Sequence, residues 1–348
     1  MHAARGAGEC ALLRLQGRER EIQARPVSLL GLSDIAAARA AIRDRVHTTP
    51  LLSARTLSAR VGTTVLLKAE LFQRTGSFKT RGAFTKLLRL EPEERSRGVV
   101  AVSSGNHAQA VAYCAQQLRI PCVTVMWPSV SPQKLAATRA YGATVDLEAA
   151  DGVEAIERAA SLADEQGLTL IPAYDDLDVI AGQGTLGLEI LDQEERVDTV
   201  LVPVSGGGLL TGVAVSVKAA RPQARIIAVE PESSPALTSA FAAGHPVYVR
   251  HDSIADGLGA PEIGTLCFEV AAPLVDSVVT VTDEQIVVAM QWLFHYAKLA
   301  VEPAGAVTTA ALLAGKVDIR DAEAVVAVVS GGNVDLAHAA EYLTSPGR

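Results

Sequence analysis

The sequence has few aromatic residues, and this scarcity excludes several kinds of protein. Phe, Trp and Tyr together make up 4% of the 348 residues. Aromatic side chains supply much of the packing in β-sandwich cores and the flat surfaces on which sugars and bases stack. We therefore expect neither a β-sandwich nor a carbohydrate-binding or base-stacking surface.

Excess positive charge and long apolar runs are missing as well. The formal net charge is −8 at pH 7, whereas surfaces that bind nucleic acid are basic. Hydrophobic residues make up 49% of the chain, but no apolar stretch reaches the roughly 18–20 residues that cross a bilayer. We predict no nucleic-acid partner and no membrane partner.

Cysteine is scarce, and its spacing excludes two kinds of cysteine site. Cys10, Cys114, Cys122 and Cys267 form no C-x-x-C pair, and disulfide frameworks are rare in chains of this size. This usage predicts a reducing, cytoplasmic compartment. A G-x-G-x-x-G fingerprint with an acidic residue about twenty positions later is also missing, which argues against a nicotinamide dehydrogenase.

The hydrophobic residues that are present predict alternating strands and helices. Short β-branched runs predict strands at residues 64–68, 98–102, 122–126, 144–147, 199–203, 225–229, 277–280 and 324–329. Several are apolar throughout, as strands buried on both faces of a parallel sheet are. A helix over residues 35–46, capped by Ser33 or Asp34, precedes them, and Ala-rich stretches such as residues 108–118 fit right-handed crossovers. The pattern and length predict an α/β protein with two doubly wound domains of open, twisted, mostly parallel sheets.

Residues 1–30 differ from the rest of the chain. Their arginines are interrupted by Glu9, Glu19 and Glu21, whereas a transit peptide would be poor in acidic residues. They also lack the apolar core of a signal peptide. We predict that these residues form a disordered extension.

A lysine-bearing segment, SFKTRGA at residues 77–83, follows the first predicted strand. Thr75 or Ser77 would cap the helix that follows, and Lys79 would lie in its first turn, where the helix dipole disfavours a positive charge. A desolvated lysine of lowered pKa is what Schiff-base chemistry requires. A surface lysine at a helix start is the simpler alternative.

Three other loops follow predicted strands. SSGNH at residues 103–107 offers hydroxyl and N–H groups at a helix start, which bind anions such as a carboxylate. SGGGL at residues 205–209 has glycines that let N–H groups surround a phosphate. SGGN at residues 330–333 places a hydroxyl at a strand end. An ordinary turn is the simpler explanation of residues 103–107 alone, and it explains each of the other two loops equally well. With Lys79, however, the three loops suit an amino acid held on pyridoxal phosphate.

The order of these motifs resembles the fold-type II pyridoxal-phosphate enzymes, in particular the threonine/serine dehydratase (threonine ammonia-lyase) and serine racemase family. The resemblance covers residues from about 33 to 343. It includes AGQGT at residues 181–185, IADG at residues 254–257 and EPAGA at residues 302–306.

The resemblance implies the architecture of the tryptophan synthase β-like fold. Residues 31–89 and 171–348 would form a large cofactor-binding domain, and residues 90–170 a small domain inserted into it. A homodimer or homotetramer is implied. Because only fifteen residues follow Asn333, no regulatory C-terminal domain is expected.

The resemblance also implies roles for individual residues. Lys79 would hold the cofactor and act as a catalytic base at the substrate Cα, and Ser104 would be a second catalytic group. Phe78 would pack beside the pyridine ring, Asn106 would bond the 3′ oxygen and Ser330 would face the ring nitrogen. The cofactor would be bound by Phe78, Lys79, Asn106, Ser205, Gly206, Gly207, Gly208, Leu209 and Ser330. The substrate would be bound by Ser103, Ser104, Gly105, His107 and Asp256.

The implied reaction removes the β-hydroxyl of L-threonine or L-serine and yields 2-oxobutyrate or pyruvate with ammonia. Ser104 is shared with serine racemases, where threonine dehydratases often have Ala. Tyr174, Asp175 and Asp176 match instead an aromatic–Asp–Asp pattern of dehydratases. We expect a catabolic dehydratase. The alternatives are serine racemase and a dehydratase of another 3-hydroxy amino acid, such as 3-hydroxyaspartate, phenylserine or a hydroxyectoine-derived one.

A metal site is not expected. Relatives bind a divalent cation with the Glu of a Glu-Pro pair and an acidic residue six positions on. Glu230 is present, but the second position is Ala236, and losing one anionic ligand weakens a site for a hard cation. Glu230 remains a weak candidate ligand and is otherwise expected to be a surface acid.

Overall fold

The structure is a computed structural model that describes residues 30–128 and 130–345. The extension predicted for residues 1–30 lies outside this part of the chain, except for Leu30, which is buried in a hydrophobic core. Within the described ranges, no helix is both long and apolar enough to cross a membrane.

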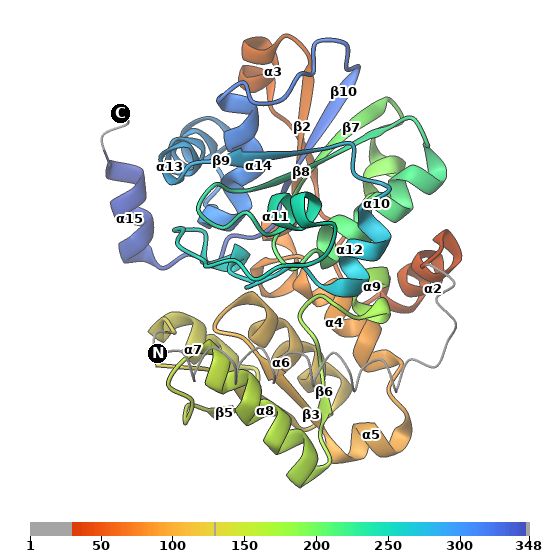
Figure 1. Cartoon of the computed structure of the whole chain (residues 1–348), viewed down its shortest axis with the longest axis vertical. Coiled ribbons are helices and arrows are strands. Elements are labelled where there is room, and N and C mark those ends of the chain that lie inside the picture. The colour runs from red at the N-terminus through yellow and green to blue at the C-terminus, as the bar shows by residue number, and fades with distance from the viewer. Residues whose placement is uncertain (1–29, 129, 346–348) are drawn as a thin grey trace. The chain divides into compact units, whose positions relative to one another are not determined.

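The described chain divides into two compact units (Figure 1). Residues 86–173 form the smaller unit, and residues 30–85 together with 174–345 form the larger one. The segment predicted as a small domain, residues 90–170, falls entirely within the smaller unit.

The larger unit is built on a six-stranded sheet in the order β1-β2-β10-β7-β8-β9. The strands are β1 (Leu51–Ser53), β2 (Thr64–Ala69), β7 (Val197–Pro203), β8 (Arg225–Pro231), β9 (Ser277–Val281) and β10 (Ala324–Val329). Neighbouring strands are parallel except β1 and β2, which pair antiparallel. Every residue of β10 is buried, because helices cover both faces of the sheet, and this explains its uninterrupted Val and Ala sequence.

Two groups of helices cover the two faces of this sheet. The helical segments of this unit are α2 (Leu32–Ile42), α3 (Arg55–Val61), η1 (Glu70–Phe72), η2 (Arg74–Gly76), α4 (Lys79–Leu88, which ends in the smaller unit), α9 (Leu177–Gln193), α10 (Gly208–Ala220), α11 (Ala236–Ala243), η3 (Asp256–Leu258), α12 (Thr265–Ala271), α13 (Asp283–Trp292), η4 (Leu293–Ala297, a π-helix), α14 (Pro303–Leu313) and α15 (Leu336–Thr344). α13 and α14 share a core with one face, and α2, α9 and α10 share a core with the other (Figure 1).

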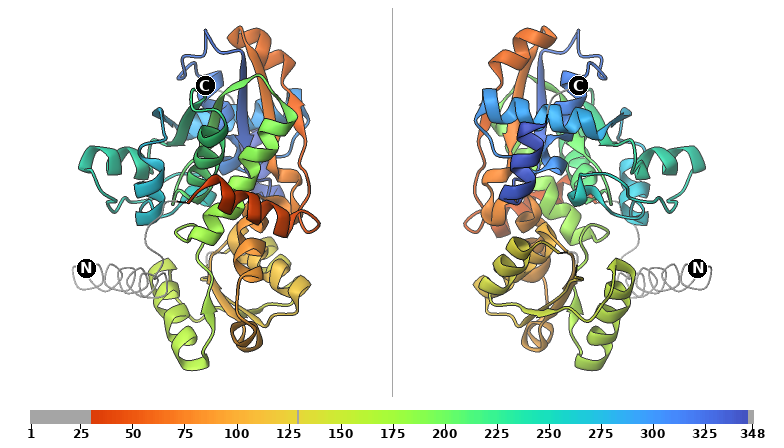
Figure 2. Two further views of the ribbon diagram at one scale, coloured as in Figure 1. Left: turned by 90° about the vertical axis from the view of Figure 1, so that its right-hand side faces the viewer. Right: turned by 90° about the vertical axis from the view of Figure 1, so that its left-hand side faces the viewer.

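The smaller unit has a four-stranded parallel sheet in the order β5-β4-β3-β6. Its elements are α5 (Pro92–Arg97), β3 (Val99–Val102), α6 (Asn106–Leu118), β4 (Cys122–Val125), α7 (Pro132–Ala140), β5 (Thr144–Asp146), α8 (Gly152–Gln166) and β6 (Thr169–Leu170). The chain reverses direction across the sheet after β5. Because crossovers are right-handed, this reversal places α8 on the face opposite α6 (Figure 2).

The α/β class with mostly parallel, doubly wound sheets is confirmed. All eight predicted strands are present, with ends within two residues of the prediction. The short strands β1 and β6 were not predicted, because runs of three and two residues carry no periodic signal. The prediction for the first helix was wrong at both ends: α2 starts at Leu32 after Gly31 and stops at Ile42.

Candidate active site

Lys79 is the first residue of α4, so it lies in the first turn of a helix, as predicted. Desolvation lowers the pKa of its amine from 10.5 to about 8, while the nearby Cys267 thiol acts in the opposite direction. The Nζ atom lies 5.2 Å from the centre of the Phe78 ring. An amine of this pKa is partly neutral near physiological pH and can act as a nucleophile or a base.

The segment before Lys79 is attached to the loop that follows β10. The Phe78 N–H donates to the Ser330 carbonyl oxygen at 3.2 Å. Ser77 and Gly331 form an isolated antiparallel bridge. The structure therefore brings Lys79 and Ser330, far apart in sequence, into one region.

Two buried hydroxyl groups lie at this junction. The Ser330 Oγ donates to the Ala304 carbonyl oxygen at 3.4 Å, which is a long hydrogen bond. The Ser77 Oγ is buried and has no hydrogen-bond partner within the described chain. A buried hydroxyl without a partner costs free energy, so this position fits a polar ligand atom.

The glycine loop between β7 and α10 is shaped by close contacts. Gly207 has a φ of +99°, which favours glycine, and a Cβ built there would lie 2.7 Å from Cys267 Cβ. A Cβ on Gly206 would overlap the Tyr174 ring, and one on Gly208 would lie 3.0 Å from Tyr174 Cα. Only glycines fit this turn. The first N–H groups of α10 have no partners within the helix, so the turn can receive an anion.

The two ends of the glycine loop are fixed by different contacts. The Ser205 Oγ accepts a hydrogen bond from the Ala260 N–H at 2.9 Å. The Leu209 side chain is buried in the core of the larger unit. Asp256, at the start of η3, is an exposed residue of the segment that leads to Ala260.

The order of the strands explains why these segments meet. The Lys79 segment follows β2, the Ser330 loop follows β10, and the glycine loop follows β7. These three strands are neighbours and parallel in the sheet. Ligands of open α/β sheets bind at the carboxyl ends of strands. The larger unit therefore places a basic amine, two hydroxyls and the glycine turn at the carboxyl ends of three neighbouring strands.

The two carboxylates of the aromatic–Asp–Asp motif, those of Asp175 and Asp176, accept hydrogen bonds from backbone N–H groups. The Asp176 carboxylate accepts the Asp178 and Val179 N–H groups and so caps α9. The Asp175 carboxylate accepts the Cys267 N–H at 3.0 Å, and burial raises its pKa. Sequence reasoning missed Asp175 and Cys267 as residues of the site. The position of Asp175 in the motif was the available signal.

The residues predicted at 103–107 lie in the smaller unit. This loop connects β3 to α6. The Gly105 N–H donates to the Ser103 Oγ at 3.0 Å, which holds the turn between Ser104 and the first residue of α6, Asn106. The buried His107 has its Nε2 2.9 Å from the Ile171 carbonyl oxygen.

The expectation that Glu230 is a surface acid was wrong. Glu230 is fully buried at the end of β8, and burial raises its pKa. Its Oε2 accepts the Leu237 N–H at 2.9 Å. Its Oε1 accepts the Thr238 N–H at 2.9 Å and the Thr238 hydroxyl at 2.5 Å. Both oxygens therefore bind the start of α11, a partner that the sequence did not reveal.

Comparison with known proteins yields relatives over most of the chain. Residues 42–331 match the family described as pyridoxal-phosphate dependent enzymes. The L-threonine ammonia-lyase of Thermotoga maritima is 41% identical over 310 residues, which cover 88% of this chain and 77% of that protein.

Solved structures agree with this result. Maize serine racemase superposes with a TM-score of 0.86 at 38% identity, covering 89% of this chain and 96% of that one. The T.th. threonine deaminase superposes with a TM-score of 0.83 at 41% identity, covering 88% of this chain and 99% of that one.

Proposed function

Because the chain belongs to the family of pyridoxal-phosphate-dependent enzymes, we propose that it is a threonine/serine ammonia-lyase. The reaction removes the Cα proton and the β-hydroxyl of L-threonine or L-serine. Hydrolysis of the resulting unsaturated amine gives 2-oxobutyrate or pyruvate and ammonia. The identity of 41% to an L-threonine ammonia-lyase over most of the chain supports this proposal.

The residues of the larger unit fit the cofactor of the family. We propose that Lys79 holds it covalently, that residues 205–209 bind its phosphate, and that Phe78 and Ser330 contact its ring. The close-packed glycine turn and the unpartnered Ser77 hydroxyl support this assignment. Asn106 of the smaller unit is proposed for the 3′ oxygen. When bound, pyridoxal phosphate withdraws electrons from the substrate Cα and weakens its C–H bond.

The observation that carries the proposal is the state of the Lys79 amine. Its pKa of about 8 in the cofactor-free protein leaves a neutral fraction at physiological pH. An amine released from the cofactor when the amino group of the substrate replaces it could therefore take the Cα proton. Ser330 is a neutral hydroxyl that donates to the Ala304 carbonyl oxygen. Toward the ring nitrogen of a bound cofactor, it would be a much weaker acid than a carboxylic acid.

The substrate carboxylate is assigned to the turn at the start of α6. We propose that Ser103, Ser104, Gly105 and His107 bind it and that Asp256 borders the side chain. The 3.0 Å hydrogen bond from the Gly105 N–H to the Ser103 Oγ gives this turn a fixed shape. Hydroxyl and N–H groups at a helix start suit a carboxylate.

The test is to give the cofactor-loaded protein L-threonine and L-serine separately in D₂O and to follow them by proton NMR. Growth of 2-oxobutyrate or pyruvate is the expected result, and the Lys79→Ala variant should produce neither. Absence of both oxo acids from the wild-type reactions would contradict the proposed substrates.

Serine racemase is the second candidate, because the chain carries Ser104 and resembles maize serine racemase at a TM-score of 0.86. This hypothesis predicts loss of the serine α-proton signal without oxo acid and formation of D-serine, which chiral chromatography detects. If neither L-threonine nor L-serine reacts, the other 3-hydroxy amino acids named above are the next substrates to test.

The assembly and compartment are proposed as well. We expect a homodimer or homotetramer, as the family resemblance implies, and light scattering after size-exclusion chromatography measures its mass. The cysteines Cys114, Cys122 and Cys267 are buried, which fits a reducing, cytoplasmic environment.

A further inference from the structure

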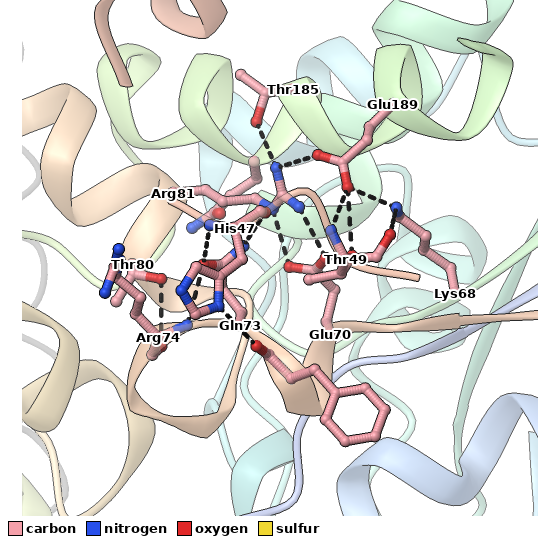
Figure 3. A network of polar contacts seen from close by, with 12 residues as sticks. His47, Thr49, Lys68, Glu70, Gln73, Arg74, Thr80, Arg81, Thr185 and Glu189 are labelled. Carbon is pink, nitrogen blue, oxygen red and sulfur yellow. Dashed lines mark hydrogen bonds and ion pairs between the residues drawn. The ribbon is translucent and has the colours of Figure 1, made fainter. Parts of the chain in front are cut away.

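Four charged side chains lie buried together in the larger unit (Figure 3). The cations are Lys68 and Arg81, the anions are Glu70 and Glu189, and all are less than 10% exposed. Their formal charges cancel. Burying charges is costly even when they are paired, and apolar side chains are often equally stable in their place. A role beyond stability therefore has to be considered.

Arg81, in the first turn of α4, is held by three partners. Its Nε and Nη2 donate to the two Glu70 carboxylate oxygens, each at 2.8 Å. Its Nη1 lies 3.0 Å from Glu189 Oε2 and donates to Thr185 Oγ1 at 3.3 Å. Two parallel hydrogen bonds fix the plane of a guanidinium as well as its position, which a single bond cannot do.

The partners of Arg81 are themselves immobilised. Lys68 Nζ donates to Glu189 Oε1 at 2.6 Å, to the Thr49 carbonyl oxygen at 2.7 Å and to Gln193 Oε1 at 2.7 Å. The Thr49 hydroxyl donates to Glu70 Oε1 at 2.5 Å. Glu189 is therefore held by Lys68 of β2, and Glu70 is held by Thr49. Neither carboxylate can move along with Arg81 if α4 rotates.

Backbone contact between α4 and α9 limits the other movements of α4. A Cβ built on Gly182 would lie 2.7 Å from Gly82 Cα, and one on Gly82 would lie 2.9 Å from the Val179 carbonyl oxygen. The two helices thus approach each other closely at these two glycines. Such a contact fixes their separation, while rotation of α4 about its own axis is limited by the bonds of Arg81.

The rotation of α4 determines where Lys79 points. Residues two apart on a helix differ by about 200° in direction, so Lys79 and Arg81 project from opposite sides of α4. We propose that Arg81 is a positioning residue, whose paired bonds to Glu70 and contact with Glu189 set the rotation of the first turn of α4 and thereby direct the Lys79 amine. This inference rests on the proposed function, in which Lys79 carries the cofactor.

The test compares two cation substitutions within the cluster. Arg81→Lys keeps the charge but loses the paired bonds on α4. Lys68→Met is the control, because it disturbs the same cluster without touching α4. Each protein is loaded with pyridoxal phosphate and reduced with borohydride, and peptide mass spectrometry gives the yield of the Lys79 adduct. The melting temperature, and kcat and KM for L-threonine, are measured alongside.

Positioning predicts that Arg81→Lys lowers the adduct yield several-fold and kcat roughly 10- to 100-fold, with KM little changed. Lys68→Met leaves both Glu70 bonds to Arg81 in place, so it should lower the melting temperature while reducing the adduct yield much less than Arg81→Lys does. Glu70→Gln keeps the side-chain shape and removes one charged acceptor, so it should change yield and kcat in the same direction as Arg81→Lys. If Arg81→Lys does not fold, the adduct yield and kcat of Glu70→Gln are compared with those of Lys68→Met, and this comparison tests the inference.

Two outcomes would overturn the inference. The first is an equal adduct yield in Arg81→Lys and wild type. The second is a loss of adduct in both Arg81→Lys and Lys68→Met that is proportional to the fall in melting temperature. Either result would show that Arg81 has only a structural role, while the proposed function would stand. Absence of an adduct on wild-type Lys79 would overturn the proposed function and the inference together.

Discussion

The N–H of Phe78 donates a 3.2 Å hydrogen bond to the carbonyl oxygen of Ser330. This bond joins the residue before the candidate catalytic lysine to the first residue after the central strand β10. The two residues proposed to contact the cofactor ring, Phe78 and Ser330, are therefore bonded directly to each other through their backbones.

Lys79→Ala should abolish the proposed reaction. The loss removes both the covalent attachment of the cofactor and the base at Cα, so we expect turnover to fall by about 10³-fold or more. Visible absorbance of the bound cofactor and steady-state kinetics measure the two effects. Lys86→Ala, on the same helix, is the control and should retain both; retained turnover in Lys79→Ala would disprove the mechanism.

Stability of the cofactor-free protein should depend on pH through Lys79. The amine titrates near 10.5 in the unfolded chain and near 8 in the folded one. Between these values the unfolded state binds more protons, so the free energy of unfolding rises with pH. Lys79→Met removes the buried amine. It should stabilise the protein near pH 7, and this gain should vanish as the pH approaches 10.5. Urea unfolding of wild type and Lys79→Met at several pH values measures this difference in the free energy of unfolding. A gain in stability that does not depend on pH would contradict the lowered pKa of Lys79.

Gly207→Ala should weaken both folding and phosphate binding. The substitution forces a residue with a Cβ into a φ of +99° and within 2.7 Å of Cys267 Cβ. We expect a loss of about 2–4 kcal/mol in the free energy of unfolding. Gly244→Ala is the control, because its φ is +77° but nothing lies within 4 Å, so only about 1 kcal/mol of backbone strain is expected. Equal losses would argue against close packing of the loop.

Ser104→Ala should separate elimination from exchange at Cα. Under the ammonia-lyase proposal, oxo-acid formation falls less than about tenfold, whereas any D-serine formation is lost. Ser103→Ala is the comparison, since it removes the acceptor of the Gly105 N–H and should raise KM by disturbing the turn. If Ser104→Ala stopped elimination completely, Ser104 would have to act in the main reaction.

Glu230 should stabilise α11 without a metal. Both of its carboxylate oxygens already accept hydrogen bonds from Leu237 and Thr238, so added Mg²⁺ or Ca²⁺ should leave the melting temperature and activity unchanged. Glu230→Gln cannot accept all of these bonds and should cost about 1–2 kcal/mol. Glu232→Gln, at an exposed residue, should change stability by less than about 0.5 kcal/mol. If Mg²⁺ or Ca²⁺ raised the melting temperature of the wild type but not that of Glu230→Gln, Glu230 would have to bind the cation.

The sequence predicted the strands and the loops at their ends because both leave local patterns. Strands such as β10 are buried on both faces and therefore consist of consecutive apolar residues. The loops carry glycine and hydroxyl residues where the backbone must turn sharply. Lys79 could be placed in the first turn of α4 because the apolar helix pattern starts there.

The partners of charged residues could not be predicted. Lys68 and Glu189 are 121 positions apart in the chain and bond at 2.6 Å, and only the order of β2 and α9 in space brings them together. Glu230 was expected at the surface because nothing nearby in sequence shows that the start of α11 folds back onto it. Sequence patterns report periodicity and local turns, whereas burial of an ion pair depends on tertiary contacts.

The enclosed charge cluster around Arg81 has a consequence for the tolerance of the protein to salt. Dissolved ions screen exposed pairs such as Arg320 and Asp318, which lie at the surface, but they reach a buried pair far less. The cluster that includes Arg81 and Glu70 has side chains with at most 10% of their surface exposed. Rising salt concentration should therefore weaken the ion pairs at the protein surface well before it weakens the buried pairs of Arg81 with Glu70 and Glu189.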